Sequence, residues 1–216
     1  MHLVIINASP RVKQKSNTDK IVSKFVEGYS EKGNTTEYYC LSDRKQWEDA
    51  KKAFENNDNI LFAIPLYVEN IPGIMLEFVE MLDSKERDNK KVSYILQGGF
   101  AEAAQLRCGE RYLEILTDYL GCIYGGTLIK GDNFGIALVP EKIANSMTNP
   151  YIEMGKVFAR EGVFKKEVVN RFAGPESFGL GIRIYISTIG RVFQRMMFRS
   201  VAKSWGCTEK LDKKVY

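Results

Sequence analysis

The feature that most constrains the fold is a regular alternation of short apolar runs with helical segments. Five runs have the length and composition of strands, and they span residues 2–7, 34–41, 60–64, 92–96 and 122–130. Between them, apolar residues recur at helical spacing. Parallel strands joined by right-handed helical crossovers are the economical arrangement for this order. We therefore predict an α/β fold with a doubly wound, five-stranded parallel sheet.

Three of the predicted strands end in unusual loops, which begin after Ile6, at Pro65 and at Gln97. The carboxyl ends of parallel strands meet at one edge of the sheet, and ligands of doubly wound folds bind at that edge. The three loops together therefore predict a binding site there.

The first loop has the composition of an anion site. It runs from Asn7 to Thr18, and Ser16 with Asp19 forms the pattern of a helix capping box. A helix N-terminus offers free N–H groups and a partial positive charge. The side chains that add donors or positive charge are Ser9, Arg11, Lys13, Lys15, Ser16, Asn17 and Thr18. A plain capped helix is the simpler alternative. Asp19 would repel a phosphate unless it points outward to its own cap.

Composition excludes several classes of site. Cys40, Cys108, Cys122 and Cys207 lie far apart without a C-x-x-C pair, which argues against zinc, an iron–sulfur cluster and a disulfide framework. His2 is the only histidine, so no metal cluster or triad can be built on histidine. The chain starts directly on a strand-like run, so we expect no secretory signal, reduced thiols and a cytoplasmic protein.

The motifs of the three loops resemble those of the flavodoxin-like NAD(P)H-dependent FMN reductases. In that family the first loop reads roughly Gly-Ser-Pro-Arg, a short spacer, then Ser or Gly, Asn, and Thr or Ser; here it reads Asn7-Ala-Ser-Pro-Arg11 and Ser16-Asn-Thr18. The second motif is Pro65-Leu66-Tyr67, followed by Pro72 and Phe78, and the third is Gln97-Gly98-Gly99-Phe100 with Glu102. The resemblance covers residues 1–135. It departs from the family at Asn7-Ala8, Met75, Leu76 and Glu80.

The resemblance implies a flavodoxin-like sheet with strand order 2-1-3-4-5, FMN as cofactor and NADPH or NADH as hydride donor. The residues that it assigns to the FMN phosphate are Ser9, Arg11, Ser16, Asn17 and Thr18. Those that it assigns to the isoalloxazine ring are Pro65, Leu66, Tyr67, Asn70, Gly98 and Gly99, with the glycines acting through backbone N–H groups. The acceptor would be a quinone, a flavin or a nitroaromatic. The cofactor carries this chemistry, so we predict no catalytic side chain and no metal. The resemblance also implies a homodimer.

Residues 136–216 are expected to form a helical, basic extension of the domain spanning residues 1–135, packed on that domain or on a partner subunit. Residues 151–216 contain 13 Lys and Arg against 6 Asp and Glu, whereas residues 1–150 contain 18 against 21. We predict an amphipathic helix over 182–205, with membrane contact as the less favoured use and nucleic acid not expected. Two rival functions remain: a flavodoxin-type electron carrier, and a non-enzymatic protein that docks on a partner or a membrane.

Overall fold

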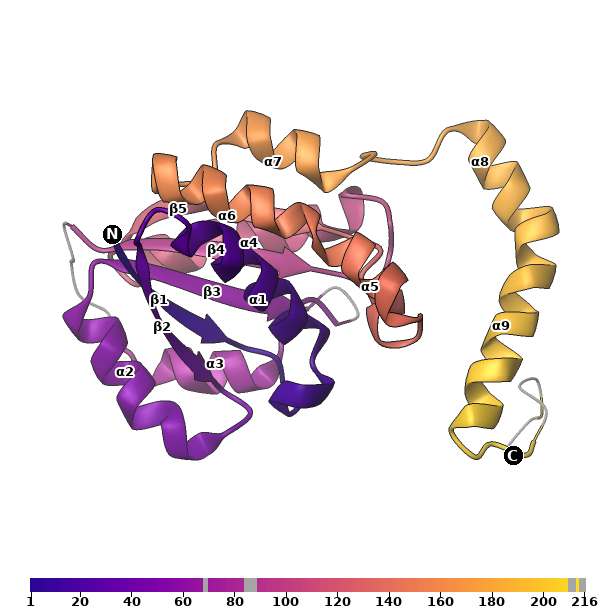
Figure 1. Ribbon diagram of the computed structural model, residues 1–216, viewed down its shortest axis with the longest axis horizontal. Helices are drawn as coiled ribbons and strands as arrows, with labels where there is room; N and C mark the ends of the chain where they lie inside the picture. The colour runs from indigo at the N-terminus through magenta and orange to yellow at the C-terminus, as the bar shows by residue number, and fades with distance from the viewer. Residues whose placement is uncertain (68–69, 84–88, 210–212, 214–216) are drawn as a thin grey trace. The chain divides into compact units, whose positions relative to one another are not determined.

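The computed structural model contains one sheet of five parallel strands in the order β2-β1-β3-β4-β5 (Figure 1). The structure describes residues 1–67, 70–83, 89–209 and 213. The strands are β1 (His2–Asn7), β2 (Thr35–Cys40), β3 (Asn59–Pro65), β4 (Lys91–Gln97) and β5 (Ile123–Lys130). The predicted α/β class and the strand order are both confirmed.

The helices fill the segments between and after these strands. They are α1 (Asn17–Ser30), α2 (Trp47–Asn56), α3 (Gly73–Glu80), α4 (Ala104–Tyr119), α5 (Glu141–Thr148), α6 (Pro150–Glu161), α7 (Lys166–Ala173), α8 (Leu180–Tyr185) and α9 (Arg191–Ser204). Three short 3-10 turns are η1 (Lys13–Lys15), η2 (Arg44–Gln46) and η3 (Phe134–Ala137). The π-helical turn η4 (Ile186–Gly190) joins α8 to α9. Gly181 lies inside α8.

Aromatic side chains bury one face of the sheet under α2, α3 and α4. The ring of Phe62 on β3 lies 6.4 Å from that of Phe78 on α3 and stacks on Tyr94 of β4 at 5.9 Å. The Tyr94 hydroxyl in turn hydrogen-bonds Thr117 of α4 (2.6 Å). Figure 1 shows α2 and α3 together on this side of the sheet.

The opposite face is covered by α1 and α6, which approach each other closely. A Cβ on Gly155 would lie 2.0 Å from the Phe25 carbonyl oxygen, and a Cβ on Gly28 would lie 1.9 Å from that of Ile152. Only glycine permits this distance between the two backbones. The edge-to-face contact of Phe25 with Phe158 (5.7 Å) completes the layer. This packing makes α6 an integral part of the domain core.

A bulge interrupts β5. The register of β4 with β5 shifts between Val92 and Tyr94, opposite Gly125 and Gly126. Gly126 has φ +91°, a left-handed conformation that glycine adopts without strain. The Gly125 carbonyl then accepts from the Phe164 N–H (2.8 Å), which fixes the segment after α6 to this edge strand.

The chain divides into two compact units, residues 1–176 and residues 177–216. In the expected extension 136–216, helices α5, α6 and α7 therefore belong to the first unit. Helix α7 packs on β5, where Lys130 Nζ donates to the Phe172 carbonyl (3.0 Å). The second unit contains α8, η4 and α9. Within the described ranges, no helix combines the length and apolar character needed to cross a membrane.

Candidate functional site

The carboxyl ends of the strands share one edge of the sheet, as predicted. Pro65 is in register with Gln97, and Gln97 with Lys130. The Leu66 N–H donates to the Gln97 carbonyl (2.7 Å), so the sheet is hydrogen-bonded up to the point where the loops begin. The loops after β1, β3 and β4 thus lie on one edge, and the loop after β5 joins them there.

The first loop ends in an open helix N-terminus. Ser16 is the N-cap of α1, and its Oγ accepts from the Asp19 N–H (3.2 Å). The N–H groups of Asn17 and Thr18 have no acceptor among the described residues. Arg11, like the two lysines of η1, is exposed. Free N–H groups next to exposed cations form a site that favours an anion.

Buried hydroxyl groups hold the loop in place. Ser9 and Thr18 are 2% and 1% exposed. Ser9 Oγ accepts from the Arg11 N–H (3.3 Å), and Thr18 Oγ1 accepts from Gln97 Nε2 (3.3 Å). A hydroxyl that accepts one hydrogen bond can still donate its own hydrogen. These groups therefore order the loop and retain donors for a ligand.

A hydrogen-bonded chain turns the carboxylate of Asp19 aside. Asn7 Oδ1 accepts from the Ser9 N–H (2.9 Å), and Asn7 Nδ2 donates to the Tyr38 hydroxyl (2.8 Å). The Tyr38 hydroxyl donates to Asp19 Oδ1 (2.6 Å). The predicted capping box is not reciprocal, because the Ser16 N–H donates to the Lys13 carbonyl (3.2 Å) instead of the Asp19 carboxylate. Asp19 does turn away from its helix end, but toward β2, through a contact 19 residues away in sequence.

Tyr38 is suited to this role because it stays protonated. Burial, followed by the bond to Asp19, raises the pKa of Tyr38 far above its usual range. Lys13 Nζ lies over the Tyr38 ring, 4.8 Å from its centroid. The aromatic ring thereby holds one end of η1 on β2, and the hydroxyl holds Asp19.

The second loop is narrow and partly exposed. The N–H and carbonyl of Tyr67 pair with the carbonyl and N–H of Asn70 at 2.9 and 3.0 Å. Pro65 is buried at the end of β3, Leu66 is half-buried and Tyr67 is 41% exposed. Val68 and Glu69 lie outside the described residues. The exposed Tyr67 ring is available to contact a ligand at this edge.

The third loop corrects one expected role. The Gly98 N–H donates to the Lys130 carbonyl (3.1 Å), so it extends the sheet and is not free for a flavin. Gly98 is buried, and a Cβ there would lie 2.9 Å from Leu106. Packing inside the protein therefore already explains this glycine. Gly99 is exposed, and its N–H has no acceptor within the described ranges.

A fourth loop, which the sequence reasoning missed, joins the others. The Asn133 N–H donates to the Gly98 carbonyl (3.0 Å), and the Asn133 carbonyl accepts from Asn17 Nδ2 (2.9 Å). A Cβ on Gly99 would lie 3.3 Å from the Cβ of Phe134. The sequence signal was available, since Gly131-Asp132-Asn133 are turn residues directly after the fifth strand.

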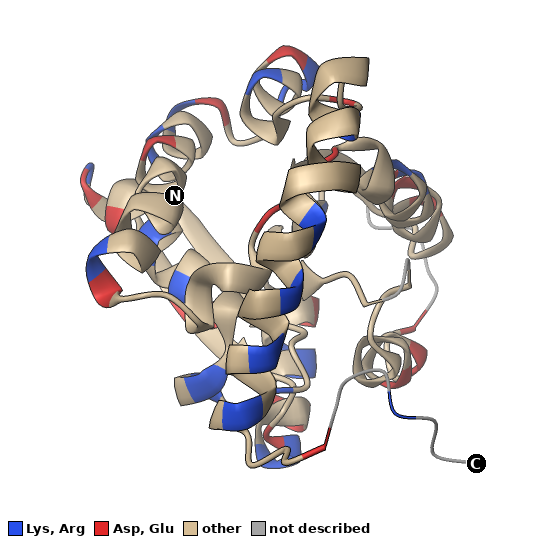
Figure 2. Ribbon diagram, turned by 90° about the vertical axis from the view of Figure 1, so that its right-hand side faces the viewer, with Lys and Arg blue, Asp and Glu red and all other residues tan. Residues whose placement is uncertain are grey.

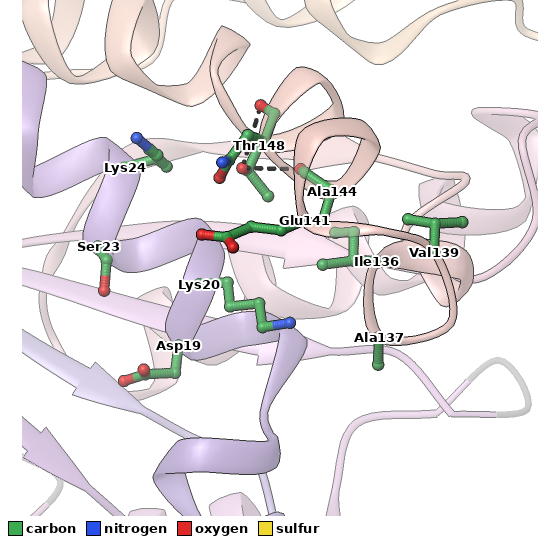
Figure 3. Close-up of a pocket in the computed structure, with 11 residues that line it drawn as sticks. Asp19, Lys20, Ser23, Lys24, Ile136, Ala137, Val139, Glu141, Ala144 and Thr148 are labelled. Atoms are coloured by element: carbon green, nitrogen blue, oxygen red, sulfur yellow. Dashed lines mark hydrogen bonds between the residues drawn. The ribbon is translucent and has the colours of Figure 1, made fainter.

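A separate cavity of about 430 Å³ lies between α1 and the η3–α5 segment (Figure 3). Its charged lining residues are Asp19, Lys20, Lys24 and Glu141. None of the residues predicted to bind FMN lines it. The cavity is therefore a neighbour of the first loop and is distinct from the edge where the four loops meet.

Comparison with known families agrees with this arrangement. The family model of the NADPH-dependent FMN reductases matches residues 1–129. The chain belongs to this family. It is accordingly an NAD(P)H-dependent reductase of the FMN-reductase type, with FMN as cofactor, and the resemblance of the loop motifs is confirmed. A search of curated proteins returned no match.

Solved structures share the fold at low sequence identity. The NAD(P)H:quinone oxidoreductase of Methanothermobacter marburgensis has a TM-score of 0.56 and 17% identity, over 74% of this chain and 98% of its own. An FMN-dependent NADH-azoreductase from Bacillus anthracis, solved with FMN, has a TM-score of 0.55 and 15% identity, over 74% of this chain and 98% of its own. Oxidised flavodoxin 1 from Bacillus cereus has a TM-score of 0.54 and 18% identity, over 74% of this chain and 99% of its own. These similarities support a flavodoxin-like fold.

The residues at the four loops fit FMN chemically. The open N-terminus of α1 with its cations suits a phosphate. Asn17 Oδ1 is buried and has no hydrogen-bond partner among the described residues. A buried acceptor of this kind calls for a donor, and the ribityl hydroxyls of FMN are donors. The first turn of α1 thus offers atoms that are complementary to a phosphate and to a hydroxyl donor.

Proposed function

We propose that FMN binds at the edge formed by the four loops, with its phosphate at the N-terminus of α1. The observation that carries this proposal is that the N–H groups of Asn17 and Thr18 have no acceptor in the part of the chain that the structure describes, and that three exposed cations precede them in the loop. The residues proposed to hold the phosphate are Ser9, Arg11, Ser16, Asn17 and Thr18.

The isoalloxazine ring is proposed to lie between the second and third loops. Its proposed contacts are Pro65, Leu66, Tyr67, Asn70, Gly98 and Gly99. Gly98 would contact the ring without donating, because both its N–H and its carbonyl are hydrogen-bonded inside the protein. The Gly99 N–H is the backbone donor that supports this proposal. A donor near the ring stabilises negative charge on a reduced flavin.

The proposed reaction is transfer of a hydride from NADH or NADPH to a small acceptor by way of FMN. When bound, FMN supplies the hydride chemistry, and the chain positions the partners and shields them from water. Tyr67, Phe100 and Phe134 are 41%, 70% and 45% exposed on three loops of the same edge. Exposed aromatic rings bind flat aromatic molecules. They favour a quinone, a flavin or a nitroaromatic as acceptor.

A homodimer and a cytoplasmic location complete the proposal. Tyr112, Ile115 and Tyr119 recur at helical spacing on the outer face of α4 and are 43%, 61% and 67% exposed. An exposed apolar stripe on a well-packed helix is typical of a subunit interface. The four cysteines form no disulfide within the described ranges, which agrees with a reducing compartment.

The visible spectrum of the purified protein, before and after addition of NADPH under anaerobic conditions, tests the proposal. We expect a flavin spectrum that NADPH bleaches and that a quinone restores. Bound flavin that NADPH leaves oxidised would indicate an electron carrier of the flavodoxin type. A colourless protein that fails to quench the fluorescence of added FMN would refute the proposed site.

A further inference from the structure

The second compact unit cannot bury its own apolar side chains. Helices α8 and α9, joined by η4, form a helical segment from Leu180 to Ser204, and neither α8 nor α9 contains a buried residue. Ile189, Phe193, Met196 and Trp205 are 65–70% exposed. A helical segment without a second layer has no core, so a partner must cover its apolar face.

One side of α9 carries a row of basic residues. Arg191, Arg195, Arg199 and Lys203 recur every four residues and form one row along the helix. At ~100° per residue, the row of Phe193, Met197 and Val201 lies ~180° around the helix from the basic row. Figure 2 shows the blue basic bands recurring along this helix. This apolar row therefore lies opposite the basic row, while the exposed side chain of Val192 lies on the same side as the basic residues.

The charge of this segment identifies the chemistry of its partner. Residues 177–208 contain five Lys and Arg and no Asp or Glu. Two copies that paired through this helix would bring like charges together, without carboxylates in the segment to compensate. An anionic surface is the complementary partner. Basic amphipathic helices with Phe, Met and Trp on the apolar face lie in the headgroup region of a bilayer.

We propose that the Leu180–Ser204 segment docks the enzyme on an anionic lipid membrane surface. The apolar row enters the boundary between headgroups and acyl chains. Arg191, Arg195 and Arg199 extend their long side chains toward the lipid phosphates. Trp205, at the end of the helix, adds the interfacial aromatic residue that membranes favour. Docking of this kind does not depend on the electron acceptor or on FMN binding. The membrane proposal and the proposed FMN site can therefore be refuted independently of each other.

Vesicle flotation of the full chain tests the proposal. The probes are vesicles of phosphatidylcholine with about 30% phosphatidylglycerol, and vesicles of phosphatidylcholine alone. We expect binding to the anionic vesicles, weakened in 0.5 M salt because the Debye length falls well below 10 Å. Trp205 fluorescence should shift to shorter wavelength on binding, measured in a Trp47→Phe background. Absence of binding to anionic vesicles at low salt would overturn the proposal.

Matched variants distinguish binding through the basic row of α9 from an effect of the net charge of the protein. The change R191Q/R195Q/R199Q should weaken binding about a hundredfold, since each cation contributes roughly fivefold. The control R111Q/K142Q/K166Q removes the same charge at exposed positions of the first unit and should change binding less than threefold. An equal loss in both variants would overturn the proposal.

The apolar face is tested with F193S/M196S, which should reduce binding at least tenfold and leave FMN binding unchanged. Sedimentation of the same variants detects the competing occupant. A dimer that F193S/M196S dissociates, in a protein that ignores anionic vesicles, would assign this face to a second copy and overturn the membrane proposal.

Discussion

The most informative single change is Tyr38→Phe, because one hydroxyl connects β1, β2 and α1. It donates to Asp19 Oδ1 (2.6 Å) and accepts from Asn7 Nδ2 (2.8 Å). Phenylalanine keeps the ring under Lys13 and removes these two bonds. The Asp19 carboxylate loses its donor, and Asn7 Nδ2 loses its acceptor.

The structure sets the size of the expected effect. A hydrogen bond to a charged group contributes about 1.5–3 kcal/mol, and a neutral one about 0.5–1.5 kcal/mol. Both are partly buried, so we expect the free energy of unfolding of Tyr38→Phe to fall by about 2–3 kcal/mol. The released carboxylate of Asp19 also becomes free to oppose a phosphate at the helix N-terminus. A charge at that position is worth roughly 0.3–1 kcal/mol, or about two- to fivefold in the Kd of FMN.

Two measurements check this reasoning. Urea denaturation gives the stability, and quenching of FMN fluorescence gives the Kd. Asp19→Asn is the matched control, because its side-chain oxygen still accepts from Tyr38 while the charge is gone. The double variant Tyr38→Phe/Asp19→Asn should recover the FMN affinity without recovering the stability. The reasoning is refuted if Tyr38→Phe unfolds within about 0.5 kcal/mol of the wild type.

Three further predictions follow from the packing. Gly155→Ala should lower the free energy of unfolding by about 1–3 kcal/mol, the approximate cost of overpacking, because its Cβ would lie 2.0 Å from the Phe25 carbonyl oxygen. Urea denaturation measures this loss. The control is Gly73→Ala, whose Cβ would meet nothing within 4 Å and which should be as stable as the wild type. Burial raises the pKa of Tyr29 and of Tyr124 to about 12, so absorbance at 295 nm at pH 11 should report fewer than the 11 tyrosines of the chain until the protein is unfolded. These raised values stabilise the fold fully below the unfolded pKa of about 10, and that stability should disappear as the pH rises through 12; full tyrosinate absorbance in the folded protein would contradict this. Ile115→Lys on the exposed stripe of α4 should shift a dimer to monomer in sedimentation, and an unchanged mass would remove α4 from the interface.

The raised pKa of Tyr38 and the close contact at Gly155 could not be predicted from the sequence, for the same reason. Their partners are distant in the chain, as when Gly155 meets Phe25 and Tyr38 meets Asp19. Periodicity reports which face of an element is buried, but it does not report what that face meets. Sequence reasoning therefore located the loops correctly and assigned the Gly98 N–H to the wrong partner.

The sequence by itself determined the α/β class, the five strands and the edge at which their loops meet. Apolar runs and helical spacing are local, and parallel strands bring their carboxyl ends to one edge wherever they pair. Strand order and cofactor came from the resemblance of three short motifs. Tertiary structure alone decided which polar groups at that edge are already used, and it brought Asn133 to Asn17 across 116 residues. It also placed α6 against α1, because hydrogen bonds and backbone contacts between distant segments leave no local pattern in the chain.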